Sequence, residues 1–112
     1  MGIWSFLARR RTARKAAMLS SEIAQRSVAP VLGRVKRRAV TMRNAEARGY
    51  VRARSLEIVH RELAALQKGR EKLAPALATE IVSLATEAVI VRVLAELRSA
   101  PAEARSPQRR AA

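Results

Sequence analysis

The stretch that decides the fold of this chain is LAPALATEIVSLATEAVIVRVLAEL, residues 73–97, the most apolar part of the sequence. Gly69 is a typical helix terminator and Pro75 is typical of a first helical turn, so we expect a short turn followed by a helix over about 75–98. The β-branched run at residues 88–93 has strand propensity, but no second strand-like run exists to pair with it. We therefore interpret the whole stretch as helical.

This expected helix is apolar on two sides. Its first apolar face is formed by Leu77, Ile81, Leu84, Ala88, Val91 and Ala95. Its second apolar face is formed by Val82, Val89, Ile90, Val93 and Leu97. A helix with two apolar sides must be covered on both of them. It does not read as a membrane span, because its charged residues are too many for a hydrocarbon core.

One side is expected to pack against a preceding helix within residues 40–68, folded back as an antiparallel hairpin. The contacting stripe of that helix, spaced 3-4-3 as in a coiled coil, is Leu56, Val59, Leu63 and Leu66. For the other side we predict a second copy of the chain, which makes the protein a homo-oligomer. The predicted interface residues are Leu77, Ile81, Leu84, Val89, Val91 and Val93. The alternative is that Ile23, Val28, Val31 and Leu32 fold back onto that side.

Upstream of the hairpin, three signals suggest shorter helical pieces. Ser20 and Ser21, followed by Glu22, are typical of a helix start. Pro30 disfavours helix at the residue before it and suits the first turn of a next helix. That helix would continue to about residue 68, with Gly33 and Gly49 as its weak points. The predicted fold is therefore all-α: a basic arm (residues 1–19), a small helical hairpin or bundle (20–98) and a disordered tail (99–112).

Charge is concentrated in the first half of the chain. Residues 1–55 contain 14 of the 23 Lys and Arg residues but only two acids, a net charge of +12. On a continuous helix, the five arginines Arg34, Arg37, Arg38, Arg48 and Arg52 fall within an arc of about 100°. A solvated helix face usually alternates sign, whereas this stripe repels itself unless an anion neutralises it. We predict these arginines as nucleic-acid-binding residues.

The first residues combine an apolar tip with a basic body. We predict a membrane or partner anchor formed by Trp4, Phe6, Leu7, Arg9, Arg10 and Arg11. A disordered start remains an alternative. Residues 1–21 also contain no acidic residue and are rich in Arg, Ser and Ala. This composition is typical of an organelle-targeting presequence. Otherwise the composition favours an intracellular, cytoplasmic protein.

Enzymatic chemistry has little support in this sequence. Cysteine is absent, and His60 is the only histidine, the residue type that most often serves as a general acid or base. A helix-surface position accounts for that histidine, and one His with scattered Glu residues does not make a metal site. There is no Gly-rich phosphate loop, zinc finger or stacking-aromatic motif. We expect no catalysis, cofactor, metal or small-molecule substrate.

The function predicted from sequence is that of a non-enzymatic basic helical protein that binds a polyanion. Nucleic acid without sequence specificity is the leading partner, with self-association through the apolar C-terminal helix. The alternative is an accessory or scaffold subunit of a larger protein assembly, including one docked at a membrane surface. In that case the arginines would meet acidic protein, RNA or lipid headgroups.

Overall fold

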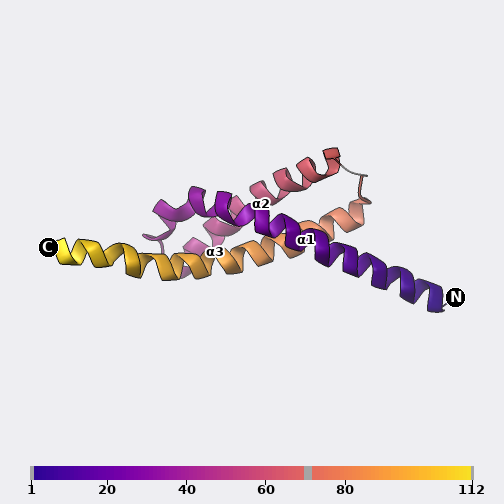
Figure 1. The fold of residues 1–112 in the computed structure, drawn as a ribbon, viewed down its shortest axis with the longest axis horizontal. Coiled ribbons are helices and arrows are strands. Elements are labelled where there is room, and N and C mark those ends of the chain that lie inside the picture. The colour runs from indigo at the N-terminus through magenta and orange to yellow at the C-terminus, as the bar shows by residue number, and fades with distance from the viewer. Residues whose placement is uncertain (1, 70–71, 112) are drawn as a thin grey trace.

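The computed structural model describes residues 2–69 and 72–111, with side chains through position 69 and from 72 to 99. Three helices follow one another: α1 (Gly2–Ala39), α2 (Asn44–Gly69) and α3 (Pro75–Ala111). The described residues contain no strand, so the predicted small all-α bundle is confirmed. Figure 1 shows α1 and α3 running in the same direction and α2 running in the opposite direction. The molecule is elongated, 70 × 28 × 20 Å.

All three helices contribute to one hydrophobic core. Its fully buried large side chains are Ile23, Val31, Val35, Val51, Val59, Ile81, Val89, Ile90 and Val93. Of the predicted stripe on α2, Val59, Leu63 and Leu66 are buried and Leu56 is half-buried. The α2–α3 hairpin therefore forms as expected, and its stripe faces inward because it offers the apolar side of an amphipathic helix.

The second apolar face of α3 is buried within the single chain, where α1 packs against the same core, whereas Leu84, Ala88, Val91 and Ala95 of the first face stay exposed. Ile23 and Val31 are buried, while Val28 and Leu32 pack against the core from its edge. The fold-back alternative is thus confirmed. As a correction, the predicted interface residues Ile81, Val89 and Val93 have no exposed surface in the single chain, so they belong to its core.

Pro30 does not interrupt α1, contrary to the sequence-based expectation. The helix is continuous from Gly2 to Ala39, and neither Ser20 nor Pro30 begins it. Proline removes one hydrogen bond to the carbonyl four residues earlier. That carbonyl belongs to Arg26, and both Arg26 and Pro30 are exposed, so water can solvate the freed group. Ser20 is accommodated inside the helix because its hydroxyl donates to the Ala17 carbonyl oxygen at 3.0 Å.

The predicted helix of residues 30–68 is instead broken at residues 40–43. The end of α1 tightens through two i→i−3 hydrogen bonds, from Thr41 N to Arg38 O and from Met42 N to Ala39 O, each 3.2 Å. The new helix begins at once, since Ala47 N donates to the Arg43 carbonyl oxygen at 2.8 Å. Neither expected weak point is the break, since Gly33 lies inside α1 and Gly49 inside α2.

The turn between α2 and α3 was placed correctly by the sequence. α2 ends at Gly69 and α3 begins at Pro75. The β-branched run at residues 88–93 is helical, as expected. The predicted tail, residues 99–112, lies almost entirely outside the residues whose side chains the structure describes, and its disorder stays a prediction.

Candidate anion-binding surfaces

The predicted arginine stripe is divided between two helices. Because the chain turns at residues 40–43, three of its arginines lie on α1 and two on α2. The Tyr50 hydroxyl lies 3.5 Å from the Arg34 carbonyl oxygen on α1, whereas Arg52 pairs with Glu87 on α3, Nη1 to Oε1 at 2.9 Å. These two contacts point to different sides of α2. The assumption that one continuous helix carries all five arginines is therefore wrong, while their role in binding nucleic acid stays a prediction.

A different set of cations lies on either side of this turn. We call it the turn-end cluster; it comprises the six bases within residues 34–48, together with Arg98, which lines the same cavity as Arg48. The six bases are Arg34, Lys36, Arg37, Arg38, Arg43 and Arg48. All seven are exposed, and residues 34–48 contain one acid, Glu46, against six bases. Among the described residues none of the seven forms an ion pair; those that exist involve Arg26, Arg52 and Arg54. The cluster is thus a cationic surface without an internal counterion in the described part of the chain.

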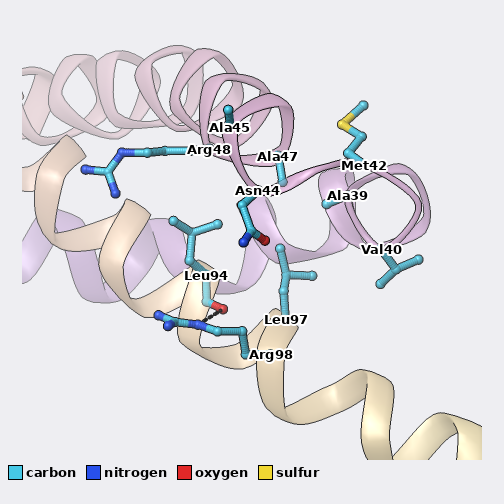
Figure 2. A pocket seen from close by; sticks show the side chains of 10 residues that line it. All are labelled: Ala39, Val40, Met42, Asn44, Ala45, Ala47, Arg48, Leu94, Leu97 and Arg98. Atoms are coloured by element: carbon cyan, nitrogen blue, oxygen red, sulfur yellow. Dashed lines mark hydrogen bonds between the residues drawn. The ribbon is translucent and has the colours of Figure 1, made fainter.

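A cavity of about 570 Å³ lies within this end of the bundle. Its lining consists of Ala39, Val40, Met42, Asn44, Ala45, Ala47, Arg48, Leu94, Leu97 and Arg98. Figure 2 shows Asn44 pointing toward Leu97, while the guanidinium groups of Arg48 and Arg98 lie on either side of Leu94. Arg98 Nε also donates to the Leu94 carbonyl oxygen at 3.4 Å. The cavity thus joins an apolar lining to two cations from different helices.

Helix dipoles separate the cluster into two groups. Lys36, Arg37 and Arg38 occupy the last turn of α1, where the dipole favours positive charge, so folding alone can account for them. Arg43 directly precedes α2, where the dipole disfavours positive charge, and Arg48 lies in the second turn of α2, where the dipole has little effect. Neither arginine gains stability from a helix dipole, so these two are the stronger candidates for contact with an anion.

The first two-fifths of α1 project from the bundle as a helix (Figure 1), and we call residues 2–15 the exposed arm. None of its residues is buried, and burial begins at Ala16. The predicted anchor residues all lie on it; among the apolar ones, Trp4 is 78%, Phe6 61% and Leu7 40% exposed. Arg9, Arg10 and Arg11 follow within the same helix and are exposed as well.

A strip of α3 also remains uncovered in the described part of the chain. Leu84 and Val91 are 44% and 61% exposed, with Ala88 and Ala95 exposed at the intervening 4-3-4 spacing. Leu77 is half-buried. The predicted interface is therefore reduced to this narrow strip, and self-association stays a prediction.

Sequence reasoning missed part of the turn-end cluster. Lys36 and Arg43 could have been found from local charge density alone, since they lie among the arginines already selected. Arg98 could not, because its proximity to Arg48 depends on how α3 packs against the N-terminal end of α2.

His60 is exposed. Within the part of the chain that the structure describes, no group of His or Glu side chains could hold a metal ion, and no helix is long and apolar enough to cross a membrane.

Comparison with models of protein families, with curated proteins and with solved structures found no match for this chain.

Proposed function

We propose that this protein binds the phosphate backbone of nucleic acid without sequence specificity, and that the turn-end cluster is its main contact surface. The single observation that carries the proposal is the concentration of seven exposed cations at the turn end of the bundle, none of which forms an ion pair with another described residue. Six of the seven are arginine, whose planar guanidinium group donates two parallel hydrogen bonds to phosphate oxygens.

The cluster consists of arginine and lysine side chains, which suit contact with phosphate oxygens. No aromatic side chain belongs to it, so bases have no stacking platform there. Backbone contacts position a protein on nucleic acid but carry no sequence information of their own. Binding through this surface would thus be largely independent of sequence.

Arg52 contributes less to this proposal than the sequence indicated. Its guanidinium group already pairs with Glu87, and both side chains are about half exposed. Such a pair contributes only about 0–1 kcal/mol to stability, so a phosphate could displace Glu87. We nevertheless expect the unpaired arginines to dominate the affinity.

The proposal is tested by a mobility-shift titration of duplex fragments of random sequence at several salt concentrations. If about five phosphates are neutralised, affinity should fall by about 10²–10³ between 50 and 200 mM salt, because each contact releases counterions. Affinity that does not change over this range would refute the proposal.

A pair of charge-matched variants locates the surface. Arg43→Gln/Arg48→Gln removes two charges from the cluster, and Arg61→Gln/Arg92→Gln removes two exposed charges elsewhere on α2 and α3. We expect the first variant to bind roughly tenfold more weakly or worse and to lower the salt slope by about 2. The second should bind nearly as the parent does. Equal losses in both variants would show that affinity follows net charge and that the cluster is not the site.

A further inference from the structure

We propose that the exposed arm docks the protein on an anionic lipid bilayer, with its apolar tip in the acyl region and its arginines among the phosphate headgroups. The tip consists of Ile3, Trp4, Phe6 and Leu7, which are 40–78% exposed. Four large apolar side chains within five residues form a surface that soluble proteins seldom leave in water. The core begins only at Ala16, so nothing in the described part of the chain covers this tip.

The basic residues follow the tip at helical spacing. Ile3, Leu7, Arg10 and Arg14 are separated by four, three and four residues, so they succeed one another along one side of α1. Leu7, Arg10, Arg11 and Arg14 border one shallow hollow of about 160 Å³. An aliphatic side chain beside three guanidinium groups matches the boundary of a bilayer, where acyl chains meet phosphates.

The charge of the arm selects an anionic surface. Residues 2–15 hold five cations and no acid, and the first acid on α1 is Glu22. Basic residues next to an inserted apolar segment are attracted to anionic headgroups, and the long arginine side chains can keep their charge at headgroup level while the tip is buried deeper. An apolar tip and a polybasic body are the two signals that stable docking on a membrane surface requires.

Other occupants fit these observations less well. A second copy of the arm would bring five cations against five cations with no acid between them. Nucleic acid would satisfy the arginines, and Trp4 or Phe6 could stack on a base, but the aliphatic Ile3 and Leu7 would stay in water. A lipid bilayer alone satisfies both the charges and all four apolar side chains.

This inference is independent of the proposed nucleic-acid surface. The exposed arm and the turn at residues 40–43 lie at opposite ends of the bundle in Figure 1. One molecule could therefore contact a membrane through the arm while the turn-end cluster remained accessible.

The tip contains its own probe, because Trp4 is the only tryptophan of the chain. The full-length protein is mixed with vesicles of phosphatidylcholine alone, or with vesicles that also contain phosphatidylglycerol. With the anionic vesicles we expect Trp4 emission to move to shorter wavelength, as the indole leaves water, and the protein to float with the lipid. Neither effect is expected with phosphatidylcholine alone or with duplex DNA. Anionic vesicles that leave the emission unchanged would overturn the proposal.

Three variants divide the contributions. Trp4→Ala/Phe6→Ala keeps every charge and should reduce flotation by roughly tenfold or more. Arg10→Gln/Arg11→Gln keeps the tip and should demand a higher fraction of anionic lipid for the same emission change. The control Arg61→Gln/Arg92→Gln loses the same charge outside the arm and should float as the parent protein does.

Each contrary result has a definite meaning. Unchanged flotation of the tip variant would show adsorption by charge alone, and equal losses in the control would show that net charge decides; either result overturns docking by the arm. An emission change with DNA but not with lipid would assign the arm to nucleic acid instead. The Arg43→Gln/Arg48→Gln variant should still float, so a failure of the nucleic-acid proposal leaves the membrane proposal standing, and the reverse holds for the tip variant in mobility shifts.

Discussion

The two parts of α1 belong to one continuous helix yet are held in place by different forces. Residues 16–39 place nine side chains in the core, whereas residues 2–15 bury none. A free helix of about 14 residues is only marginally stable in water, so the arm's helix depends on propagation from the packed part. Packing explains the residue types of the second part, but not those of the exposed arm.

Electrostatics adds to this contrast. The N-terminal end of a helix carries a partial positive charge, and α1 has no acid in its first turn to complement it. The five cations of the exposed arm, within residues 9–15, lie beyond this first turn and repel one another. An anionic surface would complement both the helix end and these cations, so a binding partner would stabilise the arm in a way that the rest of the chain does not.

The largest expected difference between residues 2–15 and 16–39 of α1 comes from a proline substitution in each. Ala24 is 4% exposed in the packed part, and Ala8 is exposed on the arm. Ala24→Pro removes a backbone hydrogen bond and introduces a ring clash against the preceding turn, which should cost about 3 kcal/mol or more of unfolding free energy. Ala8→Pro should lower the helix content measured by far-UV circular dichroism without moving the urea midpoint. A similar midpoint loss in both variants would mean that the arm packs on the bundle.

The two isoleucines of α1 give the next largest difference. Ile23 is 1% exposed and Ile3 is 75% exposed. Ile23→Ala should lower the unfolding free energy by about 2–5 kcal/mol, because it removes buried methyl groups and leaves a cavity. Ile3→Ala should change it by less than about 0.5 kcal/mol. Urea titration of both variants measures the two changes in unfolding free energy. A large loss of stability in Ile3→Ala would contradict the finding that the tip is uncovered.

Some parts of the fold could be predicted from the sequence and others could not. The α2–α3 hairpin was predictable because Gly69 and Pro75 punctuate it and because the apolar stripe on residues 56–66 has helical spacing. The α1–α2 turn was not, since residues 40–43 contain neither Gly nor Pro. Pro30 was misleading because the cost of a proline inside a helix can be offset by the packing of its neighbours, and Ser27 and Val31 beside it are buried in the tertiary structure.

The candidate sites also differ in how well the sequence predicted them. The exposed arm was found from sequence, because both its tip and its charges are contiguous. The arginine stripe failed because it assumed one helix through residues 34–52, and the turn assigned its members to different helices. The interface residues on α3 were chosen for being apolar, but hydrophobicity alone does not say whether a helix of the same chain or a second copy covers them.

Hydroxyl groups offer a finer test of burial. Ser55 is fully buried and its Oγ has no hydrogen-bond partner, whereas Ser5 on the arm is exposed. An unsatisfied buried hydroxyl costs about 1–3 kcal/mol, so Ser55→Ala should raise the unfolding free energy by about 1 kcal/mol. Ser5→Ala should leave it nearly unchanged. A loss of stability in Ser55→Ala would mean that this hydroxyl is satisfied in solution, for instance by a buried water.

Glycines give the smallest expected difference and the most direct measure of where the helix is held. A Cβ added at Gly2 or Gly49 would meet no atom within 4 Å, so neither site resists alanine by crowding. Gly49→Ala should raise the urea midpoint by an amount equivalent to about 0.5–1 kcal/mol, because alanine loses less backbone entropy when α2 forms. Gly2→Ala should leave the midpoint unchanged, since the arm can fray without global unfolding. A stabilising Gly2→Ala would show that the exposed arm and the bundle unfold as one unit, and the independence of the arm would have to be abandoned.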